Sequence, residues 1–398
     1  MIRSRCSVSN KVALCLVAAL WFSSAGAVEL GRGAQAHGFI SQALVYSSDN
    51  NIGGGSDDGV ATDMREVGAN LSWRPGADWL VSGQVLARWA GASDDGDLRL
   101  DYGFVDRGLL ADIDTSVGVR LGKIKNPYGF FNTTRDVAHT RPGIIMPQTI
   151  YLDRIRNFYL AAPGVAFYGN HATRRSDVSW SLGAIRPDGD DPDLEGLFLT
   201  QQDPGRFKGK NSWLGQVMTE IDGGRWRLGL TLGEIKMKFD PGAGSPFAAG
   251  SSRLRPYVLS LENNTERFSW TAEYSEVTNS GSGYGVPGLD DSNTLQAWYM
   301  QGTYRPADHW RVYLRRGEIY ADKTDRDGTR QNVVPPHTMF AKSWTLGVRH
   351  DINEWALSAE WHRVDGTLWV SPLDTPFKPV NAQKQDWDMI LLQAAWYF

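Results

Sequence analysis

The chain has 398 residues and a formal net charge of −4, with 45 acidic residues against 41 lysines and arginines. An acidic chain without lysine-rich or DNA-reading segments argues against nucleic acid as a partner. Its 43 glycines and 16 tryptophans are unusual in one chain, and tryptophan gathers at membrane–water interfaces, where one end of the ring is apolar and the other is wet.

The N-terminal segment, 1–27, has the three parts of a secretory signal peptide. A basic start is followed by an apolar run and by AGA at positions 25–27, which predicts cleavage before Val28. The run is too short for a membrane anchor, which needs roughly twenty apolar residues. Cys6 and Cys15 both lie in this segment, so the mature chain has no cysteine for a disulfide or a thiolate metal site. It keeps 38 basic against 45 acidic residues, a net charge of −7.

Alternation of apolar and polar residues dominates the rest of the chain, and no helical periodicity competes with it. Residues 226–233, WRLGLTLG, place a tryptophan and three leucines on one face. The pattern predicts sixteen β-strands, at residues 37–46, 65–74, 79–90, 97–109, 115–124, 164–171, 177–187, 212–221, 225–234, 254–262, 266–277, 294–304, 309–319, 342–350, 354–364 and 387–398.

The connections between these strands alternate in length. Seven are short, such as RPGAD and DGG, and eight are mostly long and rich in Gly, Asp and Pro. An even-stranded antiparallel barrel, with its tight turns and both termini on the periplasmic side, produces this alternation. The predicted fold class is therefore all-β, a transmembrane antiparallel β-barrel of about 16 strands formed by residues 28–398 as one domain.

Four of the short turns are followed by a tryptophan that restarts a strand. Because they fall at one end of the barrel, they predict an interfacial aromatic belt, although tryptophan also suits the start of any strand. These residues are Trp79, Trp226, Trp310 and Trp355. Lipid offers no hydrogen bonds, so the outward face must be apolar. We expect lipid contact for Trp226, Leu228, Leu230, Leu357 and Trp396.

The chain finishes on LLQAAWYF, residues 391–398, an apolar segment that alternates like the other strands. A buried last strand of a soluble sheet is one interpretation. In a closed barrel the same segment is the last strand of the wall. A C-terminal Phe398 after alternate apolar residues also resembles the signal by which outer-membrane barrels are recognised for assembly.

The longest connection, 125–163, follows the fifth expected strand, and an excursion of this length is normally functional. Its position resembles the third extracellular loop of sixteen-stranded Gram-negative porins, which folds into the lumen and narrows it. This resemblance implies an outer-membrane location, contact with outer-membrane lipids, a homotrimer, and passive passage of small hydrophilic solutes without a cofactor. The loop is also similar to that of the phosphate-selective porin group, through Pro127-Tyr128-Gly129, Asn132, Arg135-Asp136, Thr140-Arg141-Pro142, Pro147 and Ile150-Tyr151.

Positive charge is concentrated in and around this loop, where seven basic residues stand against two acidic ones. Rings of Arg and Lys favour anions in a pore. The residues expected to line the pore or its constriction are Arg120, Lys123, Lys125, Arg135, Asp136, Arg141, Asp153, Arg154 and Arg156, with Arg88, Arg225, Arg227, Arg311 and Arg315 from the strands. Strand alternation adds Arg99, Arg267 and Arg349 to the lumen, opposed by Glu66, Asp101, Glu220, Glu273 and Glu360.

Alternatives stay open for these charges. Asp136 and Asp153 would pin the loop if they pair locally with Arg135 and Arg154, and the lumen carboxylates would then set the field. A dedicated phosphate or sulfate site needs several guanidinium groups in bidentate geometry, which a sequence does not reveal. We expect a general bias toward small anions or small polar solutes.

We expect no enzyme activity. An outer-membrane phospholipase needs a Ser-His pair held close together, but the seven histidines are scattered and no signature serine accompanies them. The chain also has no His-x-x-x-His, calcium-loop or phosphate-loop motif, so no metal or cofactor is expected. An adhesin or surface anchor would depend on its loops, which are of moderate length and carry no repeats.

Overall fold

The computed structural model describes residues 28–199, 203–286, 288–331, 334–374 and 380–398, so the predicted signal peptide lies outside the described residues. The strands are β1 (Val28–Gly31), β2 (Ala34–Ser47), β3 (Arg65–Gly76), β4 (Trp79–Trp89), β5 (Asp95–Ala111), β6 (Thr115–Lys125), β7 (Ala161–Ala172), β8 (Ser176–Ile185), β9 (Arg206–Gly209), β10 (Ser212–Ile221), β11 (Trp226–Asp240), β12 (Ser251–Asn264), β13 (Phe268–Ser282), β14 (Ser292–Tyr304), β15 (Trp310–Tyr320), β16 (Phe340–Ile352), β17 (Trp355–Gly366) and β18 (Asp386–Tyr397).

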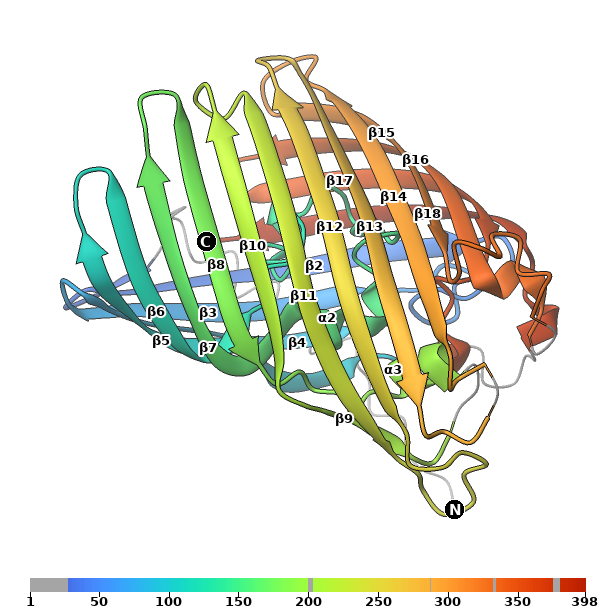
Figure 1. Ribbon diagram of the computed structural model, residues 1–398. Coiled ribbons are helices and arrows are strands. Elements are labelled where there is room, and N and C mark those ends of the chain that lie inside the picture. Colours follow the sequence, from blue (N-terminus) through green and yellow to red (C-terminus); the bar gives the residue numbers. More distant parts are fainter. Residues whose placement is uncertain (1–27, 200–202, 287, 332–333, 375–379) are drawn as a thin grey trace, which may run out of the picture.

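Sixteen of these strands form one closed antiparallel barrel (Figure 1). Each pairs with the next along the chain, except that β8 pairs with β10, and β18 closes the ring on β2. Closure satisfies the backbone hydrogen bonds without leaving a free edge in lipid. The remaining two are short additions, β1 against β2 and β9 against β11. The predicted barrel and all sixteen predicted strand positions are confirmed, although β11 runs six residues further than expected, to Asp240.

The outward face of the barrel is apolar, as the alternation predicts. Trp226, Leu228, Leu230 and Leu357 are exposed at 36–42%. The first residues of β4, β11, β15 and β17 are the four tryptophans of the predicted belt. The expectation for Trp396 was wrong in one respect, because this side chain is only 8% exposed and its ring lies 5.1 Å from that of the terminal phenylalanine.

The connections follow the predicted pattern of seven short turns and eight longer segments. The last strand is part of the wall, and Phe398 exchanges two backbone hydrogen bonds with Gly38. The described helices are α2 (Arg156–Leu160), α3 (Pro192–Leu199), η1 (Ala138–Thr140), η2 (Asp153–Ile155), η3 (Pro336–Met339), η4 (Pro372–Asp374) and η5 (Val380–Ala382). None of these described helices is long and apolar enough to cross a membrane.

Candidate functional site in the barrel lumen

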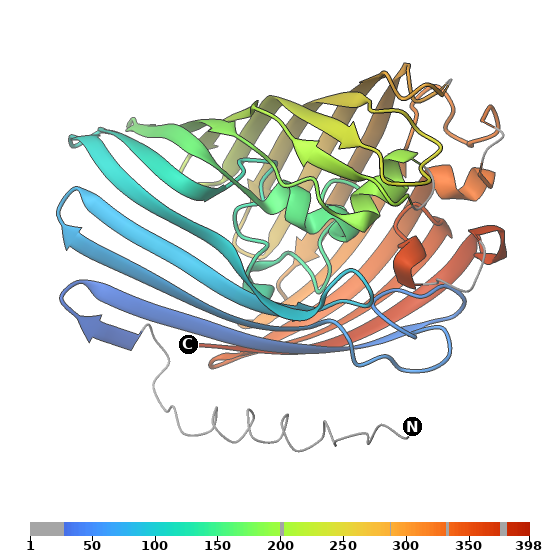
Figure 2. The ribbon, with the colours of Figure 1, turned by 90° about the horizontal axis from the view of Figure 1, so that it is seen from below.

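The segment between β6 and β7, residues 126–160, lies inside the barrel (Figure 2). We call it the lumen loop. Its backbone is held by distant parts of the wall: Phe130 N donates to Glu273 Oε1 of β13 over 2.9 Å. Ile144 N donates to Glu360 Oε1 of β17 over 2.8 Å. The inward folding of the third loop is therefore confirmed.

One glycine is required where the lumen loop begins. Gly129 has a φ of +57°, in the left-handed region that favours glycine. A Cβ at this position would lie 2.2 Å from Tyr151 Oη and 2.8 Å from Glu273 Oε1. The loop can therefore approach the wall this closely only with glycine here.

Two buried carboxylates anchor the lumen loop. Glu273 accepts hydrogen bonds from Tyr151 Oη at 2.6 Å and from Tyr299 Oη at 2.8 Å, and it is 2% exposed. Glu360 is equally buried, with His362 Nε2 at 2.9 Å from its Oε2. A buried carboxylate is retained only when it is well hydrogen-bonded. Both residues were expected as lumen carboxylates, and in the structure they hold the loop.

Arg88 of β4 is the hub of a buried ion-pair network. Its guanidinium group contacts Glu66 at 3.1 Å and also pairs with Asp94 and Asp153. Asp153, in η2 of the lumen loop, is shared with Arg135, whose Nη2 lies 3.1 Å away. Arg88 of β4 thereby joins β3, the β4–β5 connection and the lumen loop, each through one carboxylate.

Two further loop arginines pair with strand carboxylates. Arg141 Nη2 lies 2.8 Å from Glu66 Oε2. Arg156 makes a two-pronged contact with Asp101, at 3.1 and 2.9 Å. Such bidentate pairs fix position as well as charge. The structure thus brings these predicted site residues together, each with a carboxylate partner.

The local ion pairs that the sequence suggested are replaced by longer-range ones. Asp153 pairs with Arg135 instead of its neighbour Arg154. Asp136 Oδ2 lies 2.7 Å from Lys125 Nζ, at the end of β6. Both aspartates do hold the loop in place, as expected, but their partners are Lys125 and Arg135 and not the neighbouring arginines in the sequence.

Arg154 points toward other extracellular connections. Its Nη1 donates to the carbonyl oxygens of Leu368 and Val370, at 3.2 and 3.3 Å. Its Nε lies 3.5 Å from Asp193 Oδ1 of α3. This arginine therefore ties the lumen loop to the β8–β10 and β17–β18 connections.

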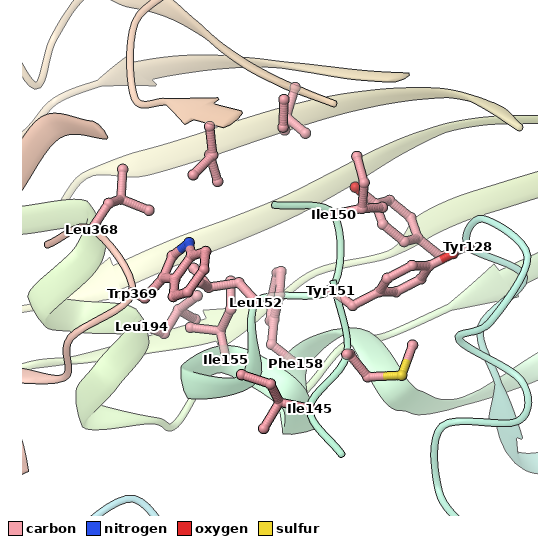
Figure 3. Close-up of a cluster of buried hydrophobic side chains, with 14 of the residues drawn as sticks. Tyr128, Ile145, Ile150, Tyr151, Leu152, Ile155, Phe158, Leu194, Leu368 and Trp369 are labelled. Carbon is pink, nitrogen blue, oxygen red and sulfur yellow. The ribbon is translucent and has the colours of Figure 1, made fainter. Parts of the chain in front are cut away.

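The same three segments share a buried apolar cluster (Figure 3). Ile145, Leu152 and Phe158 of the lumen loop pack with Leu194 of α3 and with Trp369 of the β17–β18 connection. All five side chains are at most 7% exposed. Apolar packing between the loops therefore fills the extracellular part of the lumen at this position.

Beside the lumen loop, the wall formed by β4 to β8 and β10 borders a cavity of about 460 Å³. Arg120 and Lys125 line it, and the Arg120 side chain is 41% exposed. The Arg120 Nε lies 2.6 Å from Asp106 Oδ2, and its guanidinium carbon lies 4.3 Å from the Tyr168 ring centroid. Polar neighbours in the lining are Ser82, Ser116, Asn170, Ser179, Ser181 and Gln216.

The remaining predicted residues are distributed differently. Arg225 and Arg267, expected on strand faces, lie exposed in the turns before β11 and β13, because those strands begin one and two residues later than predicted. Lys123 Nζ donates to the Leu100 carbonyl over 2.8 Å. The other strand arginines each have a polar partner: Arg99 with Asp94, Arg227 with Glu220 and Glu262, Arg311 and Arg349 with Asp351, and Arg315 with Gln301.

Sequence reasoning missed several members of this site. Asp94 and Asp193 lie in polar connections, where the strand alternation stops and gives no direction for a side chain. Tyr151 and Tyr299 anchor the loop through one carboxylate, but their sequence separation hides that contact. No signal in the sequence could have identified these partners.

His139 gives the loop a pH dependence. Its ring stacks on Tyr397 with centroids 3.8 Å apart, and burial together with the nearby Arg349 lowers the pKa of His139 to about 4. Its ordinary value is about 6.5, so the unfolded chain binds the proton more readily. Stability from this group is complete above pH 6.5 and declines as the pH falls toward 4. We expect the urea midpoint of the barrel to fall over this range, and a smaller fall in His139→Phe.

Asp153 acts at lower pH. Burial alone would raise its pKa, but Arg88 and Arg135 hold the pKa of Asp153 below its usual range. Its contribution is therefore lost only as the pH falls below about 4.

For the histidine, the contradicting outcome is an identical pH profile of the urea midpoint in the wild type and in His139→Phe. That result would show that His139 does not cause the fall between pH 6.5 and 4.

A closed sixteen-stranded barrel with an apolar outer belt and its third loop inside the lumen has the architecture of the outer-membrane porins. The fold is therefore that of the transmembrane β-barrels found in bacterial outer membranes.

The comparisons with known proteins agree with this fold. No protein-family model and no curated protein sequence matches the chain. It is similar to the outer membrane channel DcaP of Acinetobacter baumannii, with 12% identity over 92% of this chain and 98% of that chain and a TM-score of 0.58. An anion-selective porin from Comamonas acidovorans has 12% identity over 92% and 99%, with a TM-score of 0.55. In vitro folded OmpT of Vibrio cholerae, described in a trimer form, has 12% identity over 92% and 99%, with a TM-score of 0.56. At these identities the likeness concerns the fold alone.

Proposed function

We propose that the protein is a passive diffusion channel for small hydrophilic solutes. The observation that carries this proposal is the cavity of about 460 Å³ beside the lumen loop, lined by serine hydroxyls, amides and two cations. Sixteen strands, unlike eight, enclose enough space for an aqueous path. The description of DcaP as an outer membrane channel supports the same function.

We further propose an anion bias. Arg120, whose side chain is 41% exposed, and the partly buried Lys125 place positive charge at the cavity, each beside one carboxylate, Asp106 and Asp136. The low-dielectric wall focuses the field of these cations along the solute path. The buried arginines of the network are already paired with carboxylates, which favours a general bias over a dedicated phosphate site. The printed name of the Comamonas acidovorans porin also supports anion preference. The resemblance to the phosphate-selective group stays a prediction.

Reconstitution tests the channel function. Purified protein in a planar bilayer should give open conductance steps that rise linearly with voltage. A barrel that stays closed at all voltages would contradict the proposal and favour a surface anchor or adhesin. The specific observation behind that second candidate is the apolar packing of the lumen loop with α3 and the β17–β18 connection.

We also propose a homotrimer in contact with outer-membrane lipids. The trimer form described for OmpT of Vibrio cholerae supports this state. Light scattering on the detergent-solubilised protein, corrected for bound detergent, should give three times the mass of the mature chain. A monodisperse monomer in mild detergent would contradict it.

A further inference from the structure

The outside of the barrel carries a group of cations at the extracellular ends of β9, β11 and β12. Their side chains are 41–60% exposed. We call this group the outer basic patch. It consists of Arg206, Lys208, Lys236, Lys238, Arg253 and Arg255.

The strand alternation places these cations on the lipid-facing side. Along β11, Leu230 and Leu232 are exposed on the outward face, and Lys236 and Lys238 continue the same two-residue step. Between them Met237 is 1% exposed, on the inward face. The register with β12 is unbroken over this stretch, so the direction of the side chains does not switch.

The height of the patch matches the lipid headgroups. From Trp226 to Lys236 the strand advances ten residues. At about 3.3 Å per residue and a tilt of about 40°, this is a height of roughly 25 Å, the height of the apolar band. Trp213, opposite Glu234, and Tyr257, opposite Leu232 in the ladder, provide aromatic rings near the same level.

The patch has fewer carboxylates than cations. Glu234 is the carboxylate partner of three of these cations, at 2.8 Å from Lys236, 3.2 Å from Arg255 and 3.7 Å from Arg253. Lys236 and Arg253 are also direct cross-strand neighbours, and like charges in this position destabilise a sheet. A further anion beside Glu234 would relieve that repulsion.

The other three cations of the outer basic patch also outnumber their carboxylate partners. Asp240 lies 2.6 Å from Lys208 and 3.5 Å from Lys238, which face each other across the ladder. Arg206 has Asp190 at 3.4 Å. The six cations therefore share three carboxylates, which leaves a net charge of +3 among these described residues.

In the part of the opposite rim that the structure describes, carboxylates outnumber cations among the ion pairs. The extracellular ends of β13 to β18, with the β15–β16 connection, carry four cations and five carboxylates in ion pairs. The pairs are Arg316–Glu318, Lys323–Glu276, Lys342–Asp365, and Arg363 with Asp386 and Asp388. Of these two rims, the β9–β12 side therefore carries the net positive charge among the described residues.

We propose that the outer basic patch binds the phosphate groups of an anionic lipid in the extracellular leaflet. Lysine and arginine near a membrane surface attract anionic headgroups, and arginine matches phosphate oxygens in a two-pronged geometry. The exposed Leu230, Leu232 and Leu259 below the patch receive the acyl chains. This lipid site is independent of whether the lumen conducts.

Native mass spectrometry of the full mature barrel tests the site, with diphosphoryl lipid A as the added lipid. The variant neutralises four patch cations, and we expect it to bind at least tenfold more weakly. A matched control neutralises the four cations of the opposite rim and should stay within twofold of the wild type. The patch variant is Lys236→Gln, Lys238→Gln, Arg253→Gln and Arg255→Gln. The control is Arg316→Gln, Lys323→Gln, Lys342→Gln and Arg363→Gln.

Further measurements show whether the bound phosphate belongs to a lipid or is free in solution, and whether a loss of binding reflects misfolding. Phosphatidylcholine should bind equally to all variants, and inorganic phosphate at 100-fold excess over the lipid should leave lipid binding unchanged. A second variant, Lys236→Arg with Lys238→Arg, keeps the charge and should retain wild-type affinity even if the glutamine variant fails to fold. Equal losses in patch and control variants, undiminished binding in a folded patch variant, a loss of affinity in the arginine variant, or displacement by inorganic phosphate would overturn the proposal.

Discussion

Arg88→Met should detach the lumen loop from the wall and strongly destabilise the barrel. Arg88 is the shared partner of Glu66, Asp94 and Asp153, and its side chain is 5% exposed. Removing one member of a buried ion-pair network leaves uncompensated charge, at a cost of roughly 3–5 kcal/mol in the free energy of unfolding. Urea unfolding in lipid vesicles measures this loss, and single-channel recording should show a larger, noisier conductance because the loop no longer holds its position.

Arg363→Met is the matched control. Arg363 also pairs with two carboxylates, Asp386 and Asp388, but its side chain is 46% exposed on the outside of the barrel. Solvent screens such pairs, so their loss changes stability little. A wild-type urea midpoint in Arg88→Met, or an equal loss in both variants, would show that the network does not fix the loop.

Arg120→Gln should reduce the anion preference of the channel. Arg120 is the more exposed of the two cations at the cavity, with a 41% exposed side chain. One unit charge at about 4 Å in water is worth about 1 kcal/mol, which corresponds to at most about a fivefold change in the anion-to-cation permeability ratio. The reversal potential in a KCl gradient measures this ratio, and salt above about 0.1 M should weaken the effect.

Arg225→Gln provides the comparison for this measurement. It removes the same charge from the exposed turn before β11, away from the cavity lining. Its reversal potential should stay near that of the wild type. A cation-selective wild type, or equal shifts in the two variants, would show that Arg120 does not set the field along the solute path.

The positions of the strands were predictable because each is a local pattern. In β11, Trp226, Leu228 and Leu230 alternate with polar or small residues, and this pattern predicts both the strand and its lipid-facing side. Lipid enforces this pattern, since an outward polar side chain finds no hydrogen bond there. The ends were less predictable, because beyond the bilayer β11 continues to Asp240 with charged outward residues that no longer mark the membrane.

The site was only partly predictable for the same physical reason. The sequence located the basic residues of 125–163 and the long excursion that carries them. The sequence could not show which carboxylate each basic residue contacts. A loop has no regular alternation of side-chain direction, and its partners come from distant strands. Arg156 with Asp101 and Arg141 with Glu66 are examples of pairs that only the folded chain creates.

The sequence by itself therefore determined the barrel, its sixteen strands and the long basic connection 125–163, because alternation, turn length and charge are local properties. The entry of this connection into the lumen was implied only by the resemblance to porins. Only the tertiary structure decided which charges face water. The pairing of β3 with β4 and the inward folding of the lumen loop brought Arg88 against three carboxylates, whereas Arg120 lies beside the cavity. Burial and pairing depend on neighbours from other strands, so two arginines with the same local sequence pattern acquire different environments.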